Sequence, residues 1–147
     1  MANPCDYLAE IAEDFEILTS RQDQLLTLRQ YGDYLDAMDA HLKTDSALVP
    51  GCASATHIVG ELQADGTMRF MGDSESFISK GYIYILIEAL NDTTPETILK
   101  SVKLCVHDFA EKAGVRLSTI QSRANVFENV FTFMQRITVE QVASKSS

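Results

Sequence analysis

Basic side chains are scarce in this 147-residue chain, where 12 lysines and arginines face 21 aspartates and glutamates and give a formal charge of -9. Because so acidic a surface repels phosphate backbones and anionic headgroups, we expect neither nucleic acid nor a membrane as a partner. Long apolar runs are also missing, since the longest, residues 82–87, is far shorter than the roughly 20 residues of a membrane-spanning helix. The beginning of the chain has no signal-sequence pattern. These absences predict a cytoplasmic protein.

Cysteine is sparse, and the spacing of Cys5, Cys52 and Cys105 resembles no zinc or iron-sulfur ligand set. Three cysteines cannot all pair within one chain, and a domain of this size needs no disulfide, so a reducing compartment is expected. Cys105 stands between Leu104 and Val106, the setting of a buried cysteine that acts as a small hydrophobic residue. The seven glycines are scattered singly, which excludes a glycine-rich phosphate loop. We expect no metal and no cofactor.

The composition is that of a folded protein, with 46% hydrophobic and 22% charged residues. The length suits one domain, which we place at residues 1–143. Residues 144–147 are predicted to be a disordered tail, because nothing in them can be buried.

Helices are predicted on both sides of a short central region. Asn3 and Pro4 form the start of a first helix, and Ser20 begins a second whose apolar stripe extends to near Lys43. A later segment is apolar over most of its circumference after Gly81, which indicates the central core helix. The glycine should let another backbone come close to that helix.

The central region has the pattern of strands. Residues 56–62 and 67–71 suit two strands, and Asp65-Gly66 between them is a strong hairpin signal. Residues 47–49 are a candidate for a further short strand. The predicted fold class is therefore α+β, with a small antiparallel sheet of about three strands packed against several helices.

Cys52 is the strongest candidate for chemistry. It follows a Pro50-Gly51 bend and is flanked by small residues, Gly51 and residues 53–55, which leave its sulfur approachable. Successive backbone N–H groups in such a turn can stabilise a thiolate or a sulfur-centred anion. The residues alone leave open a second interpretation, in which Cys52 is a small loop residue with no task.

Other chemistry is poorly supported. His57 is the only histidine near Cys52 in the sequence, and no third group completes a catalytic triad. His107 with Cys105 and Asp108 does not form a metal cluster, because residues two apart on a helix face different ways. A crowd of acidic residues on the N-terminal helices is either a solvated face or a docking surface for a basic patch. Its members are Asp6, Glu10, Glu13, Asp14, Glu16, Asp23, Asp33, Asp36 and Asp39.

A series of short motifs gives a sharper interpretation. The chain contains, in order, Val49-Pro50-Gly51-Cys52-Ala53-Ser54, His57-Ile58-Val59, Gly72-Asp73-Ser74, Lys80-Gly81, Thr94-Pro95, and Leu117-Ser118 with Arg123 and Asn125. In this order and spacing, over residues 20–137, they resemble the SufE/CsdE family of sulfur-acceptor proteins, which activate cysteine desulfurases. The resemblance implies an α+β fold like that of SufE and IscU, with a three-stranded sheet and no cofactor.

The resemblance also implies a function and partners. A pyridoxal-phosphate cysteine desulfurase would hand sulfane sulfur to Cys52 as a persulfide, and an iron-sulfur scaffold would receive it. The chain would be a sulfurtransferase-type accessory protein that acts by transpersulfidation and stimulates the desulfurase, not a free-standing enzyme. Residues that would support the loop or contact the partner are Gly51, Ser54, His57, Asp73 and Arg123. Cluster assembly of the IscU/NifU kind is not expected, since Cys5 and Cys105 stand in the wrong elements, and a homodimer is left open.

Two positions depart from the family pattern. His57 stands where many members have a tryptophan, and Asn125-Val126 replaces the usual Asn-Gly pair. Both departures affect the fit to the partner and the local packing more than they affect the thiol of Cys52. Two rivals from other classes remain: an interaction module of the same fold with an idle Cys52, and a cysteine-dependent enzyme that turns over a small substrate without a partner.

Overall fold

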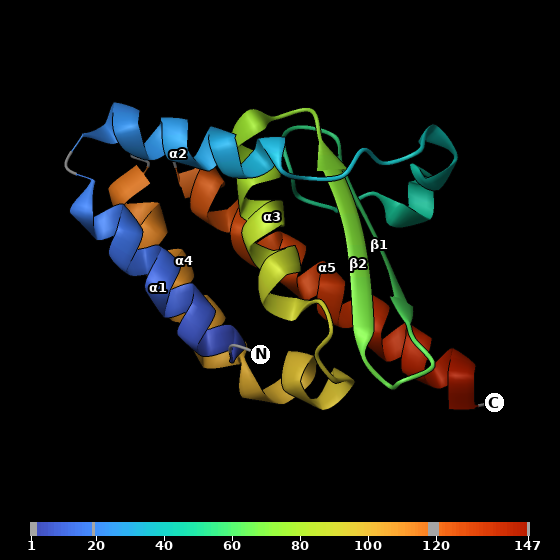
Figure 1. Ribbon diagram of the computed structural model, residues 1–147. Coiled ribbons are helices and arrows are strands. Elements are labelled where there is room, and N and C mark those ends of the chain that lie inside the picture. The colour runs from blue at the N-terminus through green and yellow to red at the C-terminus, as the bar shows by residue number, and fades with distance from the viewer. Residues whose placement is uncertain (1–2, 19, 118–120, 147) are drawn as a thin grey trace.

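The computed structural model describes residues 3–18, 20–117 and 121–146, with the side chains of 113–125 and of Ser146 outside that description. Its elements are α1 (Pro4–Ile17), α2 (Arg21–Asp33), the short 3-10 turns η1 (Ala40–Leu42) and η2 (Asp45–Ala47), β1 (Thr56–Leu62), β2 (Met68–Ser74), α3 (Phe77–Leu90), the π-helical turn η3 (Thr97–Ser101), α4 (Lys103–Leu117) and α5 (Gln121–Ser146). The predicted α+β class is confirmed. Figure 1 shows α5 running diagonally behind α3 and the two strands.

The first two helices begin where the sequence places them. The Asn3 side chain accepts a hydrogen bond from the Cys5 amide at 2.8 Å, and Ser20 accepts one from Asp23 at 3.0 Å. The predicted end of the second helix near Lys43 is wrong, because α2 stops at Asp33. Of the remaining apolar residues of the stripe, Met38 is buried and Leu35 and Leu42 are half-buried, and they lie in the segment after α2 that is not α-helical. That segment crosses in front of the strands (Figure 1) and brings Lys43 to β2.

The sheet has two strands in the described part of the chain, where about three were expected. β1 and β2 pair antiparallel from Thr56↔Ser74 to Leu62↔Met68 around the predicted Asp65-Gly66 turn. The third candidate, residues 47–49, makes only an isolated bridge between Leu48 and His57. The following Pro50 has no N–H to donate, and Gly51 turns the chain away with φ of +83°, so the pairing cannot continue.

The two faces of the sheet have different neighbours. Ile58 and Phe70 point to the buried face, where α3 and α5 pack, and Gln141 of α5 accepts a hydrogen bond from the Leu62 amide at 3.1 Å. The core helix α3 approaches α2 closely, because a side chain at Gly81 would collide with the carbonyl oxygen of Leu28. The predicted close approach at Gly81 is confirmed.

The cysteine prediction requires correction. Cys5 and Cys105 form a disulfide, with their Cα atoms 5.5 Å apart, so two of the three cysteines do pair. The two residues are 100 positions apart in sequence, but α1 packs along α4 and brings them together (Figure 1). Cys105 is half-buried at the edge of the core and is not an isolated hydrophobic residue.

The C-terminal helix is longer than the sequence predicts. α5 continues through Ser146, although residues 143–145 are exposed and a disordered tail was expected from residue 144. Nothing in residues 137–146 breaks a helix, since the stretch contains neither proline nor glycine. Among the described residues, no helix is both long enough and apolar enough to cross a membrane.

Candidate functional site

The Cys52 loop, residues 44–55, connects the irregular segment after α2 to β1. Val49 is buried at 3% exposure and anchors the loop, while Pro50 and Gly51 are exposed at its bend. Cys52 follows as a free, half-buried cysteine whose side chain packs against the edge of the core. The sulfur is therefore neither locked in the core nor fully open to solvent.

Both ends of the loop are fixed to β2. Lys43, just before the loop, donates a hydrogen bond and ion pair to Asp73 at 2.7 Å. At the other end the hydroxyls of Thr56 and Ser74 are 2.9 Å apart and buried, and Glu75 donates its amide to the Ala55 carbonyl at 3.1 Å. These contacts hold the two loop ends at a constant separation.

The bend itself has a separate anchor on α5. The Asn129 side chain donates a hydrogen bond to the Gly51 carbonyl, with its amide nitrogen 3.4 Å away. The left-handed backbone of Gly51 favours glycine, so a side chain there would be strained. Sequence reasoning missed Asn129, because an asparagine in a helix 78 residues downstream carries no signal for a loop contact.

The environment of Cys52 disfavours its thiolate. Partial burial raises the pKa of the thiol, and a hydrogen bond with Thr56 lowers it by a smaller amount. The net pKa therefore lies above the ordinary value, and less thiolate is present at neutral pH than on an unstructured cysteine. Thr56 thus contributes to both the loop anchor and the thiol.

Asp73 is held as a carboxylate at the base of the loop. Its partial burial opposes ionisation, but the hydrogen bonds from Lys43 and the Ser74 backbone, together with the charges of Lys43 and Lys80, outweigh it, so the pKa of this carboxyl is below its usual value. The Lys80 ammonium lies 3.7 Å from one carboxylate oxygen of Asp73, and Lys43 binds the other at 2.7 Å. One acidic side chain thereby links α3, β2 and the start of the loop.

The structure brings together only part of the predicted set. Gly51, Cys52 and Ser54 share the loop, and the Ser54 carbonyl accepts a hydrogen bond from Thr56 at 3.0 Å. His57 pairs across the sheet with Asp73 and alternates with Thr56 along β1, so its side chain lies on the face opposite the Thr56 hydroxyl. Within the described part of the chain no hydrogen bond joins His57 to Cys52, which removes support for a Cys-His pair.

Some of the predicted residues cannot be placed. The side chains of Leu117, Arg123 and Asn125, and Ser118 as a whole, lie outside the described residues. Within the described ranges, no group of three or more His, Cys, Asp or Glu side chains is arranged to hold a metal ion. The chemistry that the described loop offers is that of a single thiol.

Known proteins share this sequence pattern over nearly the whole chain. Residues 9–138 match the family described as SufE, Fe-S metabolism associated domain. An uncharacterised SufE-like protein of Synechocystis is 36% identical over 128 residues, covering 87% of this chain and 77% of the relative. The sulfur acceptor protein CsdE of Escherichia coli is 27% identical over 110 residues, covering 75% and 73%.

A longer relative contains a region of the same kind. The chloroplastic quinolinate synthase of Arabidopsis thaliana is 34% identical over 138 residues. The match covers 94% of this chain but only 19% of that protein.

The fold also matches a solved structure. The solution structure of a hypothetical protein from Thermus thermophilus superposes with a TM-score of 0.72, covering 97% of this chain and 99% of the other. The two sequences are only 17% identical, so the likeness concerns the fold alone. The match over residues 9–138 and the identity to the Synechocystis protein show that this chain belongs to the SufE family, whose domain is associated with Fe-S metabolism.

Proposed function

We propose that this protein accepts sulfane sulfur on Cys52 from the persulfide of a pyridoxal-phosphate cysteine desulfurase and passes it to an iron-sulfur scaffold. The observation that carries the proposal is a free, half-buried thiol on an exposed bend whose ends are fixed to the sheet. Membership of the SufE family and the similarity to a sulfur acceptor protein support it. Gly51, Ser54 and Asp73 would shape the loop, and His57 and Arg123 would contact the partner.

The transfer is a displacement at sulfur. The Cys52 thiolate attacks the terminal sulfur of the desulfurase Cys–S–SH group, a new S–S bond forms, and the old S–S bond breaks. The desulfurase cysteine leaves as a thiolate, and the sulfane sulfur with its proton stays on Cys52 as Cys–S–SH. No oxidant or reductant is needed, because the number of S–S bonds is unchanged. A thiolate of the downstream acceptor repeats the same step on the Cys52 persulfide.

Alkylation of Cys52 should be slow in the isolated protein and faster in the complex. Burial holds the pKa of the thiol above its ordinary value, and no lysine or arginine stands within seven residues of Cys52 in the sequence. The rate of iodoacetamide labelling should therefore rise with pH to a midpoint above that of free cysteine. Desulfurase at saturating concentration should increase the rate at neutral pH. A midpoint below the free-cysteine value, or a rate that the desulfurase leaves unchanged, would contradict this activation by the partner.

Mass spectrometry tests the proposed function directly. The oxidised protein is incubated with a cysteine desulfurase and labelled cysteine in the absence of reductant, and its peptides are mapped. We expect a gain of about 32 Da, one sulfur atom, on the peptide that contains Cys52. Cys5 and Cys105 serve as internal controls, since their disulfide leaves them no thiol to accept sulfur. Label on another residue, or none, would refute the proposal.

The competing interaction module predicts a different result in the same experiment. It requires partner binding but no label, because Cys52 would have no task. A cysteine-dependent enzyme would instead consume a small substrate with no desulfurase present. The cytoplasmic location and the single domain at residues 1–143 stay predictions. The Cys5–Cys105 disulfide does not favour the reducing compartment expected from the sequence.

A further inference from the structure

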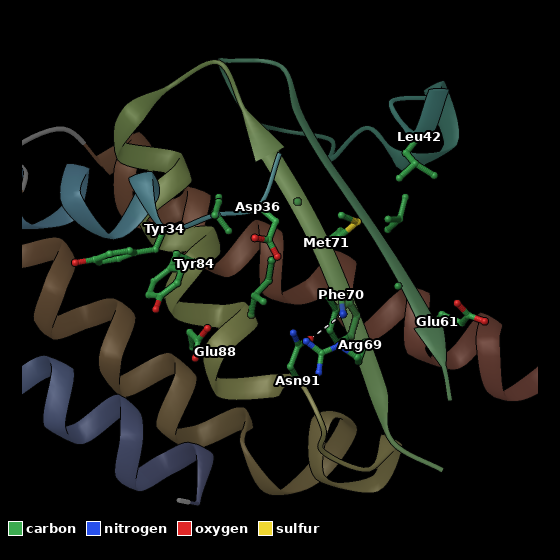
Figure 2. A pocket seen from close by; sticks show the side chains of 15 residues that line it. Tyr34, Asp36, Leu42, Glu61, Arg69, Phe70, Met71, Tyr84, Glu88 and Asn91 are labelled. Carbon is green, nitrogen blue, oxygen red and sulfur yellow. Dashed lines mark hydrogen bonds between the residues drawn. The ribbon is translucent and has the colours of Figure 1, made fainter. Parts of the chain in front are cut away.

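A cavity of about 590 Å³ lies on the sheet face opposite α5, between the strands, α3 and the segment that follows α2. Figure 2 shows it from close by, with Tyr34 and Tyr84 at one end and the strand residues Arg69 and Met71 at the other. Its described lining includes no residue of the Cys52 loop. The volume is in the usual range for a ligand site, and it is separate from the thiol.

The tyrosine end of the cavity is an aromatic platform. The rings of Tyr34 and Tyr84 lie 5.7 Å apart, and Tyr84 stacks in turn on Tyr31 at 5.9 Å with an angle of 17° between the planes. Tyr34 is 68% exposed, an unusual degree of exposure for a large aromatic side chain next to a cavity. An exposed ring, Tyr34, and a half-buried ring, Tyr84, thus line this end of the cavity.

Two carboxylates lie near this platform, and a third lies at the far end of the cavity (Figure 2). Glu88 is one helical turn after Tyr84 on α3, and Asp36 reaches the same space from the segment after α2 (Figure 2). Glu61, on β1, is the third acid and lies at the far end of the cavity. Within the described part of the chain none of the three is paired with a lysine, arginine or histidine. The one cation among the described lining residues, Arg69, is already bound by both oxygens of Asp92 at 3.0 Å.

We propose that this cavity binds an arginine side chain presented by a peptide segment of a partner protein. A guanidinium is planar, so it can stack on the Tyr34 and Tyr84 rings while it donates hydrogen bonds to Asp36 or Glu88. The protein already makes such a contact internally, with the Arg29 guanidinium 4.4 Å from the centre of the Phe77 ring. The apolar strand residues Val59 and Met71 also line the cavity, across from the platform, and can contact the aliphatic part of a segment.

Charge decides between an arginine segment and an anionic ligand. A nucleotide phosphate would meet three unpaired carboxylates and a chain of formal charge -9. The same carboxylates that repel a phosphate attract a positively charged segment. A planar guanidinium can stack on a ring and donate two parallel hydrogen bonds to a carboxylate. A lysine ammonium is not planar and cannot do both.

Titration of the full chain with three pentapeptides tests the proposal. The sequence Ac-Gly-Leu-X-Leu-Gly-NH₂ carries arginine, lysine or uncharged citrulline at X, and binding is measured by calorimetry and by amide NMR shifts. We expect the arginine peptide to bind about tenfold more tightly than the citrulline peptide, with shifts that map to α3 and β2 around Tyr84 and Arg69. Equal affinity of the two peptides, or shifts on α1, would overturn the proposal. AMP is a fourth probe, and its tighter binding at the same residues would also overturn it.

Matched variants locate the contact. Tyr34→Ala removes an exposed ring and Glu88→Gln removes an exposed negative charge, and each should weaken binding of the arginine peptide about fivefold to tenfold. Glu13→Gln, an exposed acid on α1, should leave the affinity unchanged. Cys52→Ser should also bind normally, so failure of peptide binding and failure of sulfur transfer are distinguishable. If Tyr34→Ala and Glu13→Gln behave alike, the platform is not the site.

Discussion

Replacing Cys52 by serine is expected to reduce sulfur transfer to the background level. A serine hydroxyl ionises far above neutral pH and cannot form a persulfide, so neither the attack nor the carrier state is available. The side chain lies half-buried on a loop, and the three contacts that anchor the loop, Lys43 with Asp73, Thr56 with Ser74 and Asn129 with Gly51, do not include the sulfur. A serine hydroxyl can also keep the hydrogen bond that the thiol makes with Thr56. The fold should therefore persist. The measurement is labelled sulfur delivered to the downstream acceptor, with the unfolding midpoint of the variant recorded alongside.

The same variant separates the leading function from its rival. Binding of the desulfurase should be retained in Cys52→Ser under both interpretations, whereas delivery of sulfur is lost only if Cys52 is the acceptor. The control is Cys5→Ala combined with Cys105→Ala, because it leaves Cys52 as the one thiol of the chain and should still deliver sulfur. A serine variant that delivers as much sulfur as the wild type would show that Cys52 is idle.

Opening the Cys5–Cys105 disulfide is expected to lower the free energy of unfolding by about 2–4 kcal/mol. The bond joins residues 100 positions apart, and a link of that span strongly restricts the unfolded chain. In the folded state it fastens α1 to α4, two helices that already pack together. Urea unfolding of Cys105→Ala, compared with the oxidised wild type, measures the effect.

Several controls make this stability prediction specific. Wild type in reductant should unfold like Cys105→Ala, and Cys5→Ala combined with Cys105→Ala should be no less stable than either change alone, because each removes the same bond. Cys52→Ser should change stability little. Thiol titration of the unfolded protein should give one reactive group when oxidised and three when reduced, since only Cys52 is free. An oxidised protein that titrates with three thiols would contradict the bond.

The sequence predicts which helices and strands form better than it predicts where they begin and end. The Asn3 and Ser20 caps, the Asp65-Gly66 turn and the close approach at Gly81 depend on local chemistry, and the structure has each of them. The predicted end of the second helix is wrong, because the apolar residues after Asp33 have a helical spacing but lie in a segment that is not α-helical, where Met38 is buried. The expected third strand at residues 47–49 does not form because the chain bends at residues 50–51.

Long-range contacts account for what the sequence could not predict at the site. Cys52 could be selected from its small neighbours and the family pattern, and the structure shows it free and half-buried. The tether of its loop to Asn129 and the Cys5–Cys105 pair depend on helix packing across 78 and 100 positions. The ion pair of Lys43 with Asp73 is equally nonlocal. The spacing of residues within one segment cannot predict contacts with residues so distant in the sequence.

Because both ends of the Cys52 loop are attached to β2, we expect changes at the tip of the loop to have little effect on the stability of the domain. Pro50 and Ala53 are exposed in this loop and can be varied with little effect on the core, whereas Gly51 has a left-handed backbone and Cys52 packs against the edge of the core. Substitutions at these two positions should therefore change the rate or the acceptor of the proposed sulfur transfer without unfolding the rest of the domain. Selectivity and folding can then evolve, or be engineered, independently of one another.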